Sequence, residues 1–245
     1  ARVLNEAGYM VMTFDYKGWG ESDGARTRLA PYSRVVDVQA AMTFLGIQPE
    51  VNDECLGIYG TSYGCATVVW AAAHDERVKC TVGVVGMGHG GRWMRSVRRP
   101  DEWVDLLEVS KKDREQRVQT GKSGMAARDE ILLPDRQSAA LASAARAENP
   151  NALSELPIEY IDETLQFHPE WVVDKISPRP LLLIAGGDDR LVPPEDCEFL
   201  FEKAGEPKKM VTLPGVGHYE IYVPPAFDAV MKETVAWFEK YLPAR

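Results

Sequence analysis

The sequence lacks an excess of positive charge, a cysteine framework and any long apolar run. It carries 28 Lys and Arg against 37 Asp and Glu, a formal net charge of −9. Nucleic-acid binders gather Lys and Arg against phosphates, so this balance argues against that class. The four cysteines form no C-x-x-C pair and no metal-ligand spacing with histidine, which predicts reduced thiols and no metal site. The composition does not indicate an oligomeric state.

No apolar run approaches the roughly 18 residues of a membrane span, so no membrane span is predicted. With reduced cysteines and no signal-peptide pattern, we expect a cytoplasmic protein. The chain does not begin with Met, so the question of a targeting signal ahead of it stays open.

Short apolar runs alternate with helical periodicity along most of the chain. This alternation predicts an α/β fold with a mostly parallel sheet flanked by helices. The runs are rich in Val, Ile, Leu and Met, as strands covered on both faces must be. Apolar stripes at steps of three and four predict helices from Val35 to Leu45 and from Phe227 to Leu242. The predicted strands are residues 9–15, 55–59, 80–85, 180–185 and 210–213.

One long stretch, residues 88–178, interrupts the alternation with charged and Ala-rich helical segments. A connection of this length far exceeds the usual ~2–6 residues, so we expect a helical cap inserted into the core. The predicted domains are residues 1–87, 88–178 and 179–245. Two features of the insert each have two interpretations. The arginines form either a solvated helix face or an anion-binding edge of a pocket: Arg92, Arg95, Arg98 and Arg99. The tryptophans, Trp93 and Trp103, either line a pocket or pack between helices.

The chemistry centres on the pentapeptide GTSYG, residues 60–64, between a predicted strand and a helix over residues 66–73. A sharp turn in that context presents a serine hydroxyl above the sheet and is typical of a nucleophile elbow. We expect the strained turn to require glycine at both Gly60 and Gly64. The helix N-terminus would aim the Tyr63 N–H at an oxyanion formed by attack of Ser62. The alternative is a glycine-rich turn with an idle serine.

A serine hydroxyl needs a base, and that base needs a carboxylate behind it. Of the four histidines, His218 ends a short loop after the last predicted strand, at the sheet edge where catalytic groups gather. His218 is therefore the candidate base, and an ordinary loop histidine is the alternative. His74 is expected to be exposed, His89 could border a pocket, and His168 has no evident role.

The acid should follow the preceding strand, where Asp188 and Asp189 stand side by side. Either carboxylate could orient the imidazole, and a capped turn explains an aspartate there equally well. The chain order of serine, aspartate and histidine is that of the α/β-hydrolases.

In these motifs, and in FDYKGWGES at residues 14–22, the chain resembles the serine esterase and peptidase branch of the α/β-hydrolase superfamily. The resemblance covers most of the chain outside the insert. The family's Gly-x-x-Asp-x-x-Val-Pro context selects Asp189 as the acid and makes Asp15 a structural turn. The family also places its cap between the sixth and seventh strands, where the insert falls.

The resemblance implies three further strands ahead of the helix near residues 2–7. One of them would lie between residues 9–15 and 55–59, and its loop would donate the second oxyanion N–H. An inner strand that is missing leaves backbone groups unpaired. We therefore expect these 245 residues to be the C-terminal part of a longer protein. The alternative is a fold that tolerates the loss or borrows a strand from a neighbour.

The expected function is that of a serine hydrolase that cleaves a carboxylic ester of a small or medium-sized molecule. Ser62 would form an acyl-enzyme, with His218 as base, Asp189 behind it and the Tyr63 N–H supporting the oxyanion. No metal or organic cofactor is expected. The same residues serve a peptidase or amidase, a C–C bond hydrolase or an acyltransferase. The alternative of another class is a non-catalytic ligand-binding protein of the same fold.

Overall fold

The structure is a computed structural model that describes residues 1–25, 30–135, 139, 143, 147 and 154–242. The expected insert is thus described only in part: residues 136–138, 140–142, 144–146 and 148–153 lie outside the described residues. The chain divides into two compact units. The sheet unit comprises Ala1–Phe14, Val35–Gly88 and His168–Arg245, and the helical unit comprises Asp15–Arg34 and His89–Phe167.

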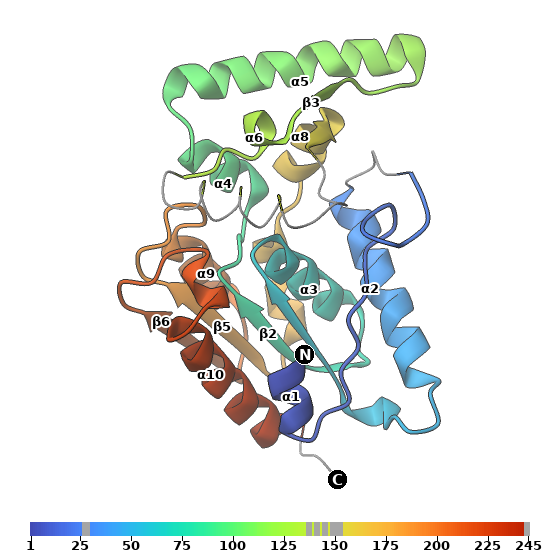
Figure 1. The fold of residues 1–245 in the computed structure, drawn as a ribbon, viewed down its shortest axis with the longest axis vertical. Helices are drawn as coiled ribbons and strands as arrows, with labels where there is room; N and C mark the ends of the chain where they lie inside the picture. The colour runs from blue at the N-terminus through green and yellow to red at the C-terminus, as the bar shows by residue number, and fades with distance from the viewer. Residues whose placement is uncertain (26–29, 136–138, 140–142, 144–146, 148–153, 243–245) are drawn as a thin grey trace. The chain divides into compact units, whose positions relative to one another are not determined.

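A parallel sheet of four strands forms the centre of the sheet unit (Figure 1). Four of the five predicted strands are confirmed, with ends shifted by at most two residues. All six residues of β5 are buried, as expected for a strand covered on both faces. The strands run in the order β1 (Leu56–Thr61), β2 (Val78–Val84), β5 (Leu181–Gly186) and β6 (Lys208–Leu213).

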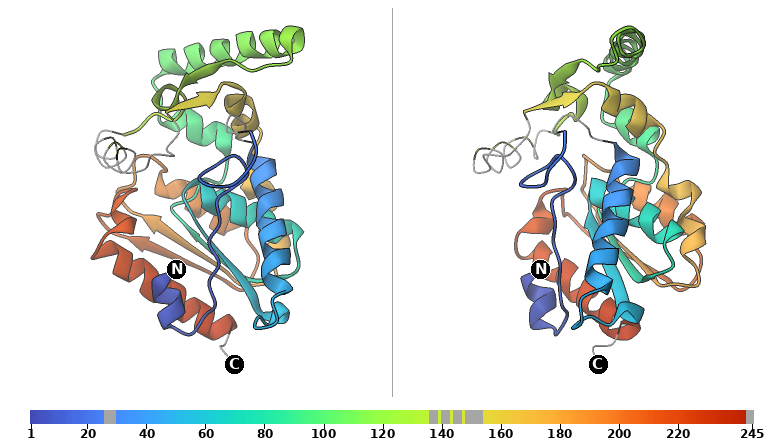
Figure 2. Two further views of the ribbon diagram at one scale, coloured as in Figure 1. Left: turned by 45° about the vertical axis from the view of Figure 1, so that its right-hand side comes forward. Right: turned by 90° about the vertical axis from the view of Figure 1, so that its right-hand side faces the viewer.

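Helices cover both faces of this sheet (Figure 2): α1 (Arg2–Glu6) and α10 (Ala226–Tyr241) on one, α3 (Tyr63–His74) and α9 (Pro194–Lys203) on the other. Two glycines of β1 allow this close packing. Gly57 faces Phe238 and Leu242, and Gly60 faces Val68 of α3. The expected parallel sheet flanked by helices is therefore confirmed. The unit also contains most of α2 (Pro31–Gly46) and four short 3-10 helices: η1 (Asp53–Cys55), η2 (Pro169–Trp171), η3 (Val173–Ile176) and η4 (Glu220–Tyr222).

The prediction of a strand over residues 9–15 is wrong. The segment has no strand structure, and β1 is an edge strand of the sheet. An extended segment becomes a strand only when a neighbour pairs with its backbone, and no described residue forms a ladder with this one. Tyr9 still packs on Phe238, with ring centroids 5.8 Å apart, and its hydroxyl donates to the Leu242 carbonyl at 3.0 Å. Apolar packing therefore holds the start of the segment without sheet pairing.

The helical unit contains the long helix α5 (Pro100–Thr120), which packs against α8 (Glu159–Leu165). Arg114 and Arg117 of α5 both pair with the buried Asp162 of α8. The unit also contains an antiparallel pair that no pattern in the sequence predicted, β3 (Met125–Ala127) and β4 (Glu155–Pro157). The described part of this unit also includes α4 (Gly90–Ser96), α6 (Arg128–Ile131) and the first turn of α2.

Arg98 of the helical unit fits neither interpretation of the arginine cluster. It is buried, and its guanidinium donates to the carbonyls of Met94, Glu130 and Ile131. Burial lowers the pKa of Arg98 to about 10. The side chain therefore joins the end of α4 to α6, whereas Arg95 and Arg99 are exposed as a solvated face requires.

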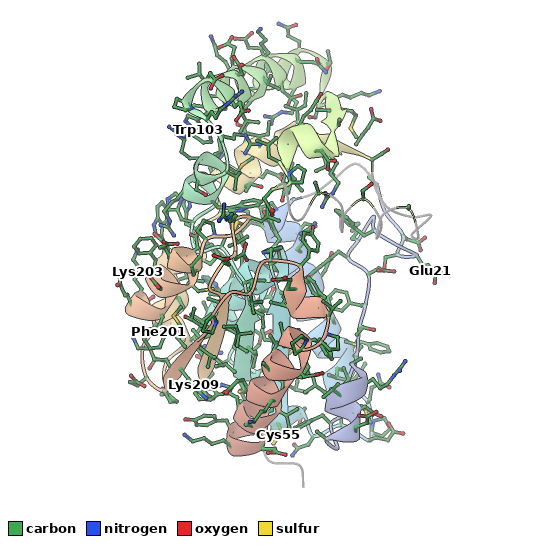
Figure 3. The ribbon with its side chains drawn as sticks, turned by 60° about the vertical axis from the view of Figure 1, so that its left-hand side comes forward. Glu21, Cys55, Trp103, Phe201, Lys203 and Lys209 are labelled. Carbon is green, nitrogen blue, oxygen red and sulfur yellow. The ribbon has the colours of Figure 1, made fainter. Side chains whose placement is uncertain are left out.

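The turn at residues 14–22 behaves as the resemblance implies. Asp15 accepts a hydrogen bond from the Glu21 backbone N–H at 3.0 Å, and its carbonyl accepts one from the Ser22 hydroxyl at 2.7 Å. Figure 3 labels Glu21 in this turn. Asp15 is thus a structural residue.

Among the helices that the structure describes, none is long and apolar enough to cross a bilayer.

Candidate active site

Ser62 occupies a strained position between β1 and α3. Its backbone has φ 54° and ψ −125°, a region that non-glycine residues rarely adopt. The Ser62 N–H donates to the Val84 carbonyl of β2 at 2.8 Å, which ties the turn to the neighbouring strand. Because β1 ends at Thr61 and α3 begins at Tyr63, Ser62 is the single residue between strand and helix at which the chain reverses.

The two glycines of the pentapeptide are not equivalent. A Cβ on Gly60 would lie 2.6 Å from the carbonyl carbon of Gly64 and 2.9 Å from Val68 Cγ2, so the turn requires glycine there. A Cβ on Gly64 would meet nothing within 4 Å. The prediction of a steric demand at both positions is therefore right for Gly60 and wrong for Gly64. The close approach is between the Gly60 side-chain position and the Gly64 backbone.

His218 lies between the serine and a buried carboxylate. Its Nε2 is 2.9 Å from Ser62 Oγ, and its Nδ1 is 2.7 Å from Asp189 Oδ2. A carboxylate only accepts hydrogen bonds, so Nδ1 carries the proton and Nε2 is left to accept from the serine hydroxyl. His218 is 4% exposed and Asp189 3%. All three predicted side chains are thus brought together in the sheet unit.

Asp189 is held from its other oxygen by the turn that follows β5. Asp189 Oδ1 accepts hydrogen bonds from the backbone N–H groups of Leu191 at 2.9 Å and Val192 at 2.8 Å. Asp188, by contrast, is exposed, and its backbone N–H donates to the Val216 carbonyl at 3.0 Å. Of the two neighbouring aspartates, only Asp189 therefore reaches the imidazole.

The loops after β5 and β6 carry the acid and the histidine, and they are bonded to each other. The Gly187 N–H donates to the Leu213 carbonyl at 2.8 Å. Gly186 leaves no room for a side chain, because a Cβ there would lie 2.6 Å from the Val216 oxygen. The glycine pair after β5 thus lets the two loops approach closely enough for the Asp189–His218 hydrogen bond.

Tyr63 is the first residue of α3 and follows Ser62 directly. Its amide therefore lies at the positive end of the helix dipole, next to the serine hydroxyl. This placement suits the expected support of an oxyanion. The second N–H that the resemblance implies was not assigned to any residue of this sequence.

The other three histidines are engaged elsewhere. His74 is exposed, as predicted, and its Nδ1 lies 2.9 Å from the Trp70 carbonyl. His89 is the N-cap of α4, where its Nδ1 accepts from the Arg92 N–H at 3.1 Å. His168 is buried in the sheet unit, and its ring centroid lies 4.1 Å from that of Trp171. These contacts give each ring a structural role.

The cysteines are free thiols, as expected. Burial raises the pKa of Cys65 and brings those of Cys80 and Cys197 to about 12. These thiols are protonated at neutral pH and are therefore poor nucleophiles. The apolar neighbours of Cys55 in the sequence predict a core residue, but its side chain is only half-buried. Figure 3 labels Cys55 near the start of β1, the end of that strand remote from Ser62. No cluster of His, Cys, Asp and Glu suited to a metal occurs among the residues that the structure describes.

Two contacts of the segment after His218 were missed by sequence reasoning. The Tyr222 hydroxyl donates to Thr61 Oγ1 at 2.9 Å. Glu220 Oε2 accepts from the Gly217 N–H at 2.6 Å. The only signal in the sequence is the pair of tyrosines at positions 219 and 222, which does not identify their partners.

Comparison with known proteins places these features in a family. Residues 1–222 match the family described as serine aminopeptidase, S33. An Escherichia coli protein described as an uncharacterized 31.7 kDa protein in the traX-finO intergenic region is 30% identical over 243 residues, covering 99% of this chain and 84% of that protein.

Two fungal proteins extend the comparison. A protein of Aspergillus aculeatus named thiohydrolase aneE is 25% identical over 261 residues, covering 99% of this chain and 80% of its own. The crystal structure of the alpha/beta hydrolase GrgF from Penicillium sp. sh18 has a TM-score of 0.76 at 23% identity, covering 93% of this chain and 78% of that one. The structural likeness supports the fold.

Proposed function

This chain belongs to the α/β-hydrolase superfamily, in the family described as serine aminopeptidase, S33, and from that premise we propose that it is a serine hydrolase that forms an acyl-enzyme on Ser62. The proposal is carried by one observation. Asp189, His218 and Ser62 are joined in series by hydrogen bonds of 2.7 and 2.9 Å. Such a series can move a proton from the hydroxyl to the imidazole while the carboxylate stabilises the cation that forms.

In the acylation step, Ser62 Oγ attacks the substrate carbonyl carbon and its proton passes to His218 Nε2. The charge on the carbonyl oxygen is stabilised by the Tyr63 N–H at the start of α3. When the tetrahedral intermediate collapses, the bond to the leaving group breaks and His218 returns the proton to that group. The products are the free leaving group and an ester on Ser62.

In the deacylation step, water attacks the acyl carbon and gives its proton to His218. The second intermediate expels Ser62 Oγ, which recovers that proton, and the carboxylic acid leaves. Both steps use only groups of the chain itself and water, so the proposed reaction calls for no cofactor. Asp189 keeps Nδ1 protonated throughout, because its other oxygen is fixed by two backbone N–H groups.

We propose a carboxylic ester of a small or medium-sized molecule as the substrate. A thioester is a second candidate, favoured by the relative named thiohydrolase at 25% identity. The ester and the thioester would form the same acyl-enzyme and differ in the leaving group. A thiolate leaves more easily than an alkoxide. Hydrolysis of amides or of C–C bonds, and transfer of the acyl group to an acceptor other than water, remain proposals for the same three residues.

The test is a panel of p-nitrophenyl esters of increasing acyl length, with thioester and anilide analogues, together with a fluorophosphonate probe. We expect turnover of at least one ester or thioester and stoichiometric labelling, both lost in Ser62→Ala. Ser177→Ala is the matched control, because Ser177 lies in the same unit and its hydroxyl only donates to the Glu206 carbonyl at 2.7 Å. A well-folded protein that neither labels nor turns over any analogue would favour a non-catalytic ligand-binding protein.

A further inference from the structure

We propose that Tyr222 is a positioning residue that fastens the segment carrying His218 to the strand carrying Ser62. This inference rests on the proposed function. It is carried by the hydrogen bond of 2.9 Å from the Tyr222 hydroxyl to Thr61 Oγ1. A phenol is protonated at neutral pH, so the Tyr222 O–H donates and the threonine oxygen accepts.

The bond joins the two segments that the reaction must keep together. Thr61 is the last residue of β1 and immediately precedes Ser62, and Tyr222 ends η4, four residues after His218. The Tyr222–Thr61 bond therefore runs in parallel with the His218–Ser62 bond of 2.9 Å, between the same two parts of the chain. The partners are 161 residues apart in sequence, so local structure does not bring them together.

The rings between these two bonds are in contact. The Tyr219 ring packs edge-on against His218, with centroids 5.3 Å apart, and lies 6.1 Å from the Tyr222 ring. A shift of Tyr222 would thus be passed through Tyr219 to the imidazole. We infer that the three rings move as one group, which the Tyr222 hydroxyl holds against the end of β1.

Other hydrogen bonds of the histidine loop lead in other directions. The Val216 carbonyl accepts from Asp188 in the loop after β5, and the Gly217 N–H donates to Glu220 within the same segment. Neither bond reaches β1. The loop also contains Gly215, whose backbone has φ 70°. Because glycine has no side chain, no side-chain packing restrains the loop at that point. Of these bonds, the Tyr222–Thr61 bond is the one that ties the segment to β1, beside the His218–Ser62 bond itself.

Packing alone does not account for Tyr222, because its side chain remains 45% exposed. Little apolar area is lost when its hydroxyl is removed, so Tyr222→Phe tests the hydrogen bond and leaves the ring in place. Thr61 offers a matched pair of variants. Thr61→Ser keeps the accepting oxygen, and Thr61→Val keeps the shape and removes it.

The experiment measures kcat and KM on the best ester of the panel for Tyr222→Phe, Thr61→Val, Thr61→Ser and the Tyr222→Phe/Thr61→Val double variant. We expect either loss of the hydrogen bond to lower kcat about fivefold, the size expected for one neutral hydrogen bond, with KM nearly unchanged. Thr61→Ser should keep the activity of the wild type. The double variant should be no slower than either single variant, because both remove the same interaction.

Tyr9→Phe is the control for the loss of a tyrosine hydroxyl. It removes a hydrogen bond of 3.0 Å, to the Leu242 carbonyl, in the same unit and away from Ser62, and should leave kcat unchanged. Full kcat in Tyr222→Phe, or multiplied losses in the double variant, would overturn the role of Tyr222 while the proposed function stands. A wild-type protein without turnover or labelling would overturn the proposed function, and the role of Tyr222 with it.

Discussion

Two buried carboxylates, Asp189 in the sheet unit and Asp162 in the helical unit, have partners of different kinds. Asp162 pairs with Arg114 and Arg117, whose guanidinium groups do not release a proton in proteins. Asp189 pairs with His218, whose other nitrogen is 2.9 Å from a serine hydroxyl. A histidine gains and loses a proton near neutral pH, whereas an arginine does not. The buried carboxylate therefore joins two helices in the helical unit, and in the sheet unit it supports the proton transfer that we propose.

The largest expected effect comes from changing Asp189. Asp189→Asn keeps the shape, but an amide that donates to Nδ1 would stabilise the tautomer in which Nε2 cannot accept the serine proton. We expect kcat to fall by about 10⁴-fold, with a small change in unfolding free energy. Steady-state kinetics and urea unfolding measure the two effects. A kcat within tenfold of the wild type would contradict the proposal that Asp189, unlike Asp162, supports proton transfer.

For Asp162 we expect the opposite result, a loss of stability with little change in kcat. In Asp162→Ala, Arg114 and Arg117 lose the carboxylate that joins α5 to α8. Because both arginines retain some exposure, we expect the unfolding free energy to fall by about 2–3 kcal/mol, less than for a fully buried pair. The chemical step should be unaffected, so kcat per folded molecule should stay within about twofold. Urea unfolding and active-site titration with the fluorophosphonate probe measure these quantities.

The pentapeptide turn provides a comparison within the sheet unit itself. Gly60→Ala places a Cβ against the Gly64 backbone and Val68, and should cost about 1–2 kcal/mol of stability together with activity. Gly64→Ala meets no atom within 4 Å and lies inside α3, where alanine is the better helix former. We expect Gly64→Ala to fold at least as well as the wild type. Equal damage from both variants would contradict the asymmetry of the turn.

The smallest effect concerns Asp75, a buried carboxylate in the sheet unit that is paired with arginine. The hydrogen bond from Arg77 holds the pKa of Asp75 below its ordinary value. The unfolded chain therefore takes up this proton at a higher pH than the folded one, so the stabilisation is present above about pH 4 and is lost as pH falls.

Because Arg77 is 44% exposed, we expect less than about 1 kcal/mol from the Asp75–Arg77 pair. The measurement is the difference in unfolding free energy between the wild type and Asp75→Asn at pH 7 and pH 3. That difference should shrink at the lower pH. A difference that does not change with pH would show that the pair contributes no such stabilisation.

Features set by neighbouring residues could be predicted from the sequence. The strand, the one-residue turn at Ser62 and the helix α3 follow from a short apolar run, spaced glycines and helical periodicity. The carboxyl ends of β5 and β6 could also be predicted as the positions of the candidate acid and base. The signals are the glycine pair at positions 186 and 187, before the two aspartates, and the short loop before His218. The choice of Asp189 over Asp188 needed the family's motif, because each aspartate alone fits the turn.

Contacts between distant segments were decided only by the tertiary structure. Residues 9–15 have the composition of a strand but lack a paired neighbour, and Arg98 lies among carbonyls that its helical spacing does not indicate. The Tyr222–Thr61 bond joins η4, which follows β6, to the end of β1, although these two strands form opposite edges of the sheet. Steric and periodic signals act over a few residues, whereas a hydrogen-bond partner is selected by packing across the sheet. For that reason the proposed catalytic groups could be predicted from the sequence, whereas the contacts that hold them in place came only from the tertiary structure.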